Sequence, residues 1–243
     1  MHIDYSGQPG IKFVALDFCG TLAELSPSSS ELLQDFLKNF YSIGASEAAI
    51  QEALRRTAYE LPYSSIKINS KELRMNHYDE FNERLLGYLG CTPAKPRELY
   101  EHFSAHKRHW KIKPGGHALL RELKSRRYTL VVASNFDENL EDLLIGLDVR
   151  DFFSHLFVSA VLGVEKPSTE FYELIVASLN CRPEEIVMIG DDLVLDIYPS
   201  TAVGMKNIHL NCEAENTSSL SALRGAGQYI HASDFSGILK VLP

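Results

Sequence analysis

Residues 11–22 read IKFVALDFCGTL, in which an apolar run ends at Asp17 and gives way at once to Cys-Gly-Thr. A short apolar run bounded by polar residues is typical of a strand that is buried on both faces of a sheet. A carboxylate at the end of such a strand, with a thiol two residues later, calls for a functional explanation.

Similar apolar segments recur in the second half of the chain. YTLVVAS (128–134), HLFVSA (155–160) and EIVMIGDD (185–192) are clear examples, and KNIHL (206–210) and YIH (229–231) are weaker ones. Each is followed by apolar residues at helical spacing. Apolar strands that alternate with amphipathic helices predict an α/β fold, a doubly wound parallel sheet in a Rossmann-like, three-layer core.

Residues 26–110 have a different pattern. Ser30, Ser46 and Ser70 stand where serine caps a helix, and Pro96 stands where a first helical turn tolerates proline, opening RELYEHFSAHKRHW. No strand is expected here.

The domain organisation follows from this contrast. We expect an all-α insert domain at 26–110, entered through a hinge at SPSSS (26–30). It would interrupt a discontinuous α/β core domain formed by residues 1–25 and 111–243.

Composition excludes several partners. The net charge of −8 disfavours nucleic acid and anionic membranes, and no apolar run approaches the ~20 residues that span a bilayer. The N-terminus lacks a secretory signal, and the four cysteines show neither C-x-x-C spacing nor disulfide-rich density. These features predict a cytoplasmic protein with reduced thiols, and leave open whether it is a monomer or a homodimer.

Polar residues of one chemical type follow the predicted strands. In open parallel sheets, ligands bind at the carboxyl ends of the strands. A single residue of this kind is usually a cap or a turn, but several together at successive strand ends indicate a site. The residues are Asp17, Ser134, Asn135, Lys166, Asp191 and Asp192.

In these motifs the chain resembles the haloacid dehalogenase-like superfamily, whose members are mostly phosphatases and phosphotransferases. The first family motif, D-x-D-G-T-[LV], is matched by DFCGTL, and the second by the serine of VVASN. The third is the lysine of GVEKPS, and the fourth, G-D-x-x-x-x-D, is matched by GDDLVLD with Asp191 and Asp196. The insert at 26–110 lies where the family carries a helical cap of the C1 type.

The resemblance implies a role for each residue. Asp17 would be the nucleophile, and Mg²⁺ would be held by Asp17, Asp191 and the backbone carbonyl of Cys19. Phosphate would be bound by Ser134, Lys166, Asn135 and the loop backbone at Phe18 and Gly20. The supporting residues would be Thr21, Asp192 and Asp196, although Asp192 could equally be a helix cap.

Cys19 departs from the family pattern. Phosphatases of the family place a second aspartate there, which protonates the leaving oxygen and then activates water. A thiol with a reference pKa of about 8.5 is a weak proton donor, and neighbouring carboxylates oppose its ionisation. Without the second aspartate as acid–base catalyst, the rate would fall by about 10²–10⁴-fold, but metal binding and electrostatic stabilisation can survive.

Three functional hypotheses remain open. The first is a slow or specialised Mg²⁺-dependent phosphatase or phosphotransferase for a small phosphorylated metabolite. The second is a non-catalytic phosphate- or partner-binding protein, and the third is a phosphonate-cleaving hydrolase that uses a lysine of the insert: Lys38, Lys67, Lys71, Lys95 or Lys107. A redox role for Cys19 has only its location in its favour, and the intact GDD…D argues against dehalogenation.

The segment HFSAHKRHW (102–110) offers a further possibility. His102, His106 and His109 would share one face if the helix continued through them. We expect a solvated polar face rather than a metal site. The sequence does not identify the substrate.

Overall fold

The computed structural model describes residues 10–61, 71–210 and 229–242, with residues 71–74 as backbone only. The chain divides into two compact units, Met1–Glu24 with Lys111–Pro243 and Leu25–Trp110. We call them unit 1 and unit 2. None of the described helices combines the length and the apolar character needed to cross a bilayer.

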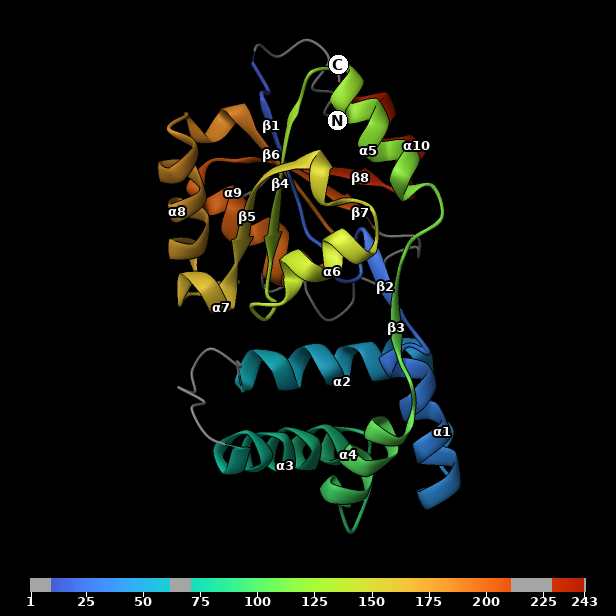
Figure 1. Cartoon of the computed structure of the whole chain (residues 1–243). Helices are drawn as coiled ribbons and strands as arrows, with labels where there is room; N and C mark the ends of the chain where they lie inside the picture. Colours follow the sequence, from blue (N-terminus) through green and yellow to red (C-terminus); the bar gives the residue numbers. More distant parts are fainter. Residues whose placement is uncertain (1–9, 62–70, 211–228, 243) are drawn as a thin grey trace. The chain divides into compact units, whose positions relative to one another are not determined.

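Unit 1 is built on a six-stranded parallel sheet of the order β5-β4-β1-β6-β7-β8 (Figure 1). The α/β fold is therefore as predicted from the apolar runs. Central strands read as continuous apolar segments because both of their faces are covered. The strands are β1 (Phe13–Leu16), β4 (Thr129–Ser134), β5 (Phe153–Val158), β6 (Ile186–Gly190), β7 (Lys206–Leu210) and β8 (Ile230–Ala232).

Helices cover both faces of this sheet. Figure 1 shows α8 on one side and α5 with α10 on the other. On the α8 side, Ala15 and Val131 of the sheet pack in one buried cluster with Phe171, Tyr172 and Ile175 of α8. The helices of unit 1 are α5 (Gly116–Ser125), α6 (Leu140–Gly146), α7 (Ser159–Leu162), α8 (Thr169–Leu179), α9 (Tyr198–Val203) and α10 (Phe235–Val241), with short helices η2 (Arg150–Phe152), η3 (Pro183–Glu185) and η4 (Leu193–Ile197).

Unit 2 is helical and has its own apolar core. Its helices are α1 (Ser29–Tyr41), α2 (Glu47–Glu60), α3 (Lys71–Tyr88) and α4 (Pro96–Ala105). Phe36, Ile50, Leu86 and Leu99, one from each helix, are fully buried in this core. Because the unit buries a core without the sheet, it can be a folding unit of its own.

Helix starts in unit 2 follow the predicted chemistry with one correction. Ser46 caps α2 and Pro96 opens α4, as expected. The cap of α1 is Ser28, not Ser30. Ser28 accepts a hydrogen bond from the N–H of Glu31, and the Glu31 carboxylate accepts one from the N–H of Ser28, which is a capping box. Ser70, Lys67 and the side chain of Lys71 lie outside the described residues.

The expectation of no strand at the start and end of the insert is wrong. A separate two-stranded sheet is formed by β2 (Ala23–Ser26) and β3 (His109–Ile112). The helix of residues 96–110 is also shorter than predicted, because α4 ends at Ala105 and His106 is extended. His109 therefore lies on a strand, and the three histidines do not share a helical face. The guanidinium of Arg108 binds Pro27 O and Ser29 Oγ, which holds the chain out of a helix here.

Candidate active site

The polar residues predicted from the strand ends come together at the carboxyl edge of the sheet. Asp17 directly follows β1, Ser134 ends β4 and Asp191 directly follows β6, and these strands are neighbours in the sheet. Lys166 enters from the loop between α7 and α8. Parallel register brings these chain positions to one edge, as sheet topology requires.

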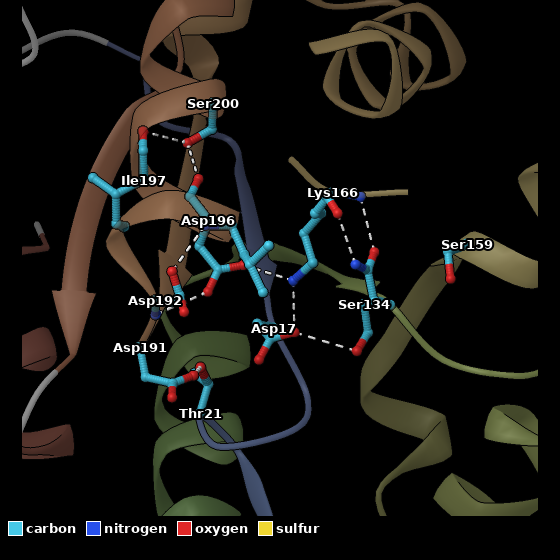
Figure 2. A network of polar contacts seen from close by, with 12 residues as sticks. Asp17, Thr21, Ser134, Ser159, Lys166, Asp191, Asp192, Asp196, Ile197 and Ser200 are labelled. Atoms are coloured by element: carbon cyan, nitrogen blue, oxygen red, sulfur yellow. Dashed lines mark hydrogen bonds and ion pairs between the residues drawn. The ribbon is translucent and has the colours of Figure 1, made fainter. Parts of the chain in front are cut away.

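Lys166 links two carboxylates. Its Nζ lies 2.8 Å from Asp17 Oδ1 and 2.6 Å from Asp196 Oδ1, and all three side chains are buried (Figure 2). Burial alone would lower the Lys166 pKa, but the charges of Asp17 and Asp196 outweigh it and hold the pKa well above its ordinary value. The residue therefore supplies a fixed positive charge beside Asp17.

Three carboxylates form an acidic cluster. Asp17, Asp191 and Asp196 each offer an oxygen, and these oxygens all lie within 4.8 Å of one another. Burial, followed by the charge of Asp17, raises the pKa of Asp191 to about 6. Hard oxygen donors held this closely suit Mg²⁺, and a divalent cation would relieve the repulsion that the raised pKa reports. The residues present therefore fit a magnesium site.

The loop after β1 is held against this cluster. Thr21 Oγ1 donates to Asp191 Oδ1 at 2.7 Å, and the N–H groups of Leu22 and Ala23 both donate to Phe18 O. Gly20 has φ +85°, and a Cβ there would lie 2.5 Å from Asp191 Oδ2. Only glycine permits this turn and this close approach together.

The end of β4 supplies two different kinds of contact, one from Ser134 and one from Asn135. Ser134 Oγ lies 3.2 Å from Asp17 Oδ1 and donates to it. Asn135 instead exchanges two 2.9 Å hydrogen bonds with the backbone of Lys166, through its Nδ2 to the carbonyl and its Oδ1 from the N–H. Asn135 thus positions the lysine, and its expected contact with phosphate stays a prediction.

A π-helix, η4, follows the end of β6 and organises the residues there. Asp192 Oδ1 accepts from the N–H groups of Val194 and Leu195 at 2.7 and 2.9 Å, so Asp192 does cap this helix. The turn places Asp196 back toward the sheet, where its Oδ2 accepts from Asp192 N. Single π-helical turns often occur at functional sites, and here the turn aims a carboxylate at Lys166.

Cys19 stands beside the acidic cluster. Burial, with the charges of Asp17 and Asp191 behind it, raises the pKa of the thiol to about 12. Since the residue as a whole is exposed, the two carboxylates are the firmer cause of this direction. A thiol with so high a pKa stays protonated at neutral pH and cannot serve as a base.

Several residues at the site were not predicted from the sequence. Lys113 binds the loop twice, through its N–H to Leu22 O at 3.0 Å and through its ammonium to Gly20 O. Tyr172 donates to Leu195 O at 2.5 Å, and Ser200 donates to Asp196 O, so both support the π-helix. Lys113 lies shortly after the predicted insert, where no family motif points to it, and no motif points to Tyr172 or Ser200 either.

Comparisons with known proteins agree with this geometry. A family model described as haloacid dehalogenase-like hydrolase matches residues 11–204. Phosphoserine phosphatase of Thermus thermophilus is 24% identical over 218 residues, which are 82% of this chain and 88% of that protein. Glyceraldehyde 3-phosphate phosphatase of Pyrococcus furiosus is 33% identical over 96 residues, 39% of this chain and 40% of that one. A magnesium-bound HAD-hydrolase structure from Bacillus subtilis covers 94% of this chain and 97% of its own, with a TM-score of 0.62 and 16% identity.

Proposed function

Because the chain belongs to the haloacid dehalogenase-like hydrolase family, we propose that it is a phosphatase or phosphotransferase that acts on a small phosphorylated metabolite through an aspartyl phosphate on Asp17. The observation that carries the proposal is the Lys166 ammonium, held 2.8 Å from an Asp17 oxygen within the acidic cluster. Relatives named phosphoserine phosphatase and glyceraldehyde 3-phosphate phosphatase support a small phosphorylated substrate.

Charge neutralisation is the first requirement of the reaction. An anionic carboxylate can approach a phosphate only when their repulsion is offset. Lys166 provides one positive charge, and its bond to Asp196 fixes the ammonium in place. Mg²⁺ held by Asp17, Asp191 and the Cys19 carbonyl would add charge neutralisation for both the nucleophile and the phosphate oxygens.

Phosphoryl transfer would then depend on residues already in place. An Asp17 oxygen attacks phosphorus, the bond from phosphorus to the leaving oxygen breaks, and the phosphoryl group becomes an acyl phosphate on Asp17. Ser134 Oγ, 3.2 Å from Asp17 Oδ1, is placed to donate to a phosphate oxygen. The backbone N–H of Phe18 would bind the same anion. The N–H of Gly20 instead donates to Ala23 O at 2.8 Å, so this glycine shapes the loop and does not supply the phosphate donor that was expected of it. Water then cleaves the acyl phosphate and returns Asp17.

The thiol of Cys19 determines which substrates react. A thiol protonates a leaving alkoxide poorly, and the carboxylates around Cys19 keep it protonated, which makes it a poor base for the water of the second step. We therefore expect a preference for phosphates with good leaving groups, such as aryl or acyl phosphates, and slow release of phosphate from Asp17. A reducing compartment such as the cytoplasm suits this thiol.

The substitution Cys19→Asp tests the proposal. It restores a carboxyl acid–base group and should raise hydrolysis of an alkyl phosphate by about 10²-fold or more. The measurement is phosphate release with Mg²⁺ across a panel of phosphorylated metabolites, together with intact mass after incubation with acetyl phosphate. The wild type should show an adduct of about 80 Da, one phosphoryl group, and Asp17→Asn should show none.

A non-catalytic phosphate-binding protein is the second candidate, favoured by the high pKa of Cys19. It predicts thermal stabilisation by Mg²⁺ with orthovanadate, no adduct and no turnover in any substrate class. If Cys19→Asp also stayed inert while still binding the mimic, the enzyme proposal would be wrong and the binding role would stand.

A further inference from the structure

Lys113 directs its side chain into the loop that follows β1. Its ammonium donates to Gly20 O and its N–H donates to Leu22 O. The carboxylate of Asp191 lies against the same glycine, since a Cβ on Gly20 would meet Asp191 Oδ2 at 2.5 Å. The Lys113 ammonium and the Asp191 carboxylate thus adjoin one residue.

The charges of the acidic cluster are unevenly balanced. Lys166 pairs with Asp17 and Asp196 at 2.8 and 2.6 Å. Asp191 receives the Thr21 hydroxyl instead, a neutral donor. The charge of Lys113 acts on Asp191 and on Cys19, favouring the ionised form of each. Of the two lysines at the cluster, Lys113 is therefore the one placed to balance Asp191.

We propose that Lys113 is the resident counter-charge of Asp191 and lowers the affinity of the acidic cluster for Mg²⁺. The inference rests on the proposed function, because it takes Asp191 as a ligand of the metal. Lys113 and Asp191 meet the same glycine without forming an ion pair with each other, and an ammonium at this short range repels an incoming divalent cation.

Two roles of Lys113 can be separated by substitution. Lys113→Gln keeps a donor for Gly20 O but removes the charge, and Lys113→Met removes both. Lys113→Arg keeps both. An exposed lysine of α5, Lys124, serves as the matched control, because Lys124→Met changes the net charge of the protein by the same amount away from the site.

Isothermal titration of each protein with Mg²⁺ alone, without any substrate, is the test. Lys113→Gln and Lys113→Met should bind Mg²⁺ about tenfold more tightly than the wild type, the effect of one charge interaction between partly exposed groups. Lys113→Arg and Lys124→Met should bind it as the wild type does. Mg²⁺ binding by Lys113→Gln in the absence of wild-type binding would also support the inference.

Three results would overturn it. Equal affinity in the wild type and Lys113→Gln, with weaker binding in Lys113→Met, would make Lys113 a structural hydrogen-bond donor only. Equal affinity in every variant would remove the charge effect and leave the proposed function intact. Absence of Mg²⁺ binding in all of them would overturn the inference and take the metal out of the proposed function, while the aspartyl-phosphate adduct would still test the nucleophile.

Discussion

Gly20 and Gly190 have no side chains, and the carboxylates of Asp191 and Asp196 occupy the positions that a Cβ would take. A Cβ on Gly190 would lie 2.3 Å from Asp196 Cγ, just as one on Gly20 would collide with Asp191. Gly190 ends β6, and Asp196 folds back over it from η4. The site therefore depends on missing side chains as much as on the charged ones, because Asp196 reaches Lys166 only across a bare backbone.

Gly190→Ala should destabilise the protein by about 1–3 kcal/mol, the usual cost of overpacking a buried site. The added methyl would push Asp196 away from Lys166, so phosphoryl transfer should fall as well. Urea unfolding measures the stability change. Gly146→Ala in α6 is the control, because nothing lies within 4 Å of its Cβ and its φ is not positive. Equal stability of the two variants would show that the Asp196 contact is not tight.

At this scale the sequence predicts the charged residues well and their supports poorly. Asp17, Ser134 and Asp191 stand at strand ends, and strand ends can be found from apolar runs. Lys166 lies further along, in the loop between α7 and α8, and was found through the family motif. Apolar runs do not reveal Lys113, because its contact with Gly20 O joins two chain segments that are separated in sequence by the insert. Asn135 was assigned to phosphate binding because it follows Ser134, whereas in the structure its side-chain amide binds the backbone of Lys166.

Among the elements, β1 and β6 are tied together where they begin. Lys12 donates its N–H to Glu185 O at 2.8 Å, and its ammonium lies 2.7 Å from Glu185 Oε1. Glu185 Oε2 also accepts from Arg182 N at 2.9 Å. These bonds, first that of Lys12 and then that of Arg182, lower the pKa of Glu185 to about 2.

Glu185→Gln should therefore destabilise the protein at neutral pH and have little effect in acid. A carboxyl whose pKa falls on folding stabilises the native state above its unfolded pKa, which is 4.5 for Glu185. This contribution is lost as the pH falls toward about 2, where the folded carboxyl is protonated. Urea midpoints of variant and wild type, compared at several pH values, should converge across that window. Glu184→Gln, at an exposed neighbour, should show no such convergence, and a constant gap for Glu185→Gln would contradict the assignment.

Elements with a long apolar signal are predicted from the sequence, and short ones are missed. Four of the six strands of unit 1, β1, β4, β5 and β6, have clear apolar runs, whereas β7 and β8 carry polar residues within shorter runs and were the weaker predictions. The strands β2 and β3 have half-exposed patterns without a continuous apolar run, so they resemble loops and helix ends. The helix of residues 96–110 was drawn too long, because its last residues suit a helix by composition while Arg108 fixes them by contacts with Pro27 and Ser29.

For the whole molecule, the division into two units separates chemistry from the insert. All residues of the acidic cluster belong to unit 1, although unit 1 is interrupted in sequence by 86 residues of unit 2, Leu25–Trp110. Unit 2 buries its own core. When two units unfold separately, a bound ligand stabilises only the unit that holds it. A substitution that destabilises unit 2 should therefore leave the stabilisation of unit 1 by its ligand unchanged.

Mg²⁺ should raise the melting temperature of the protein through Asp191. At a Mg²⁺ concentration of 100 times the dissociation constant, binding stabilises a folded protein by about 2.7 kcal/mol. Asp191→Asn should abolish this shift. Without metal the variant should be at least as stable as the wild type, because the ionised, half-buried Asp191 lies close to the carboxylate of Asp17, which raises the free energy of the folded state. Differential scanning calorimetry with EDTA and then with Mg²⁺ measures both effects. Asp142→Asn, at an exposed residue of α6, should keep the wild-type shift, whereas an undiminished shift in Asp191→Asn would place the metal elsewhere.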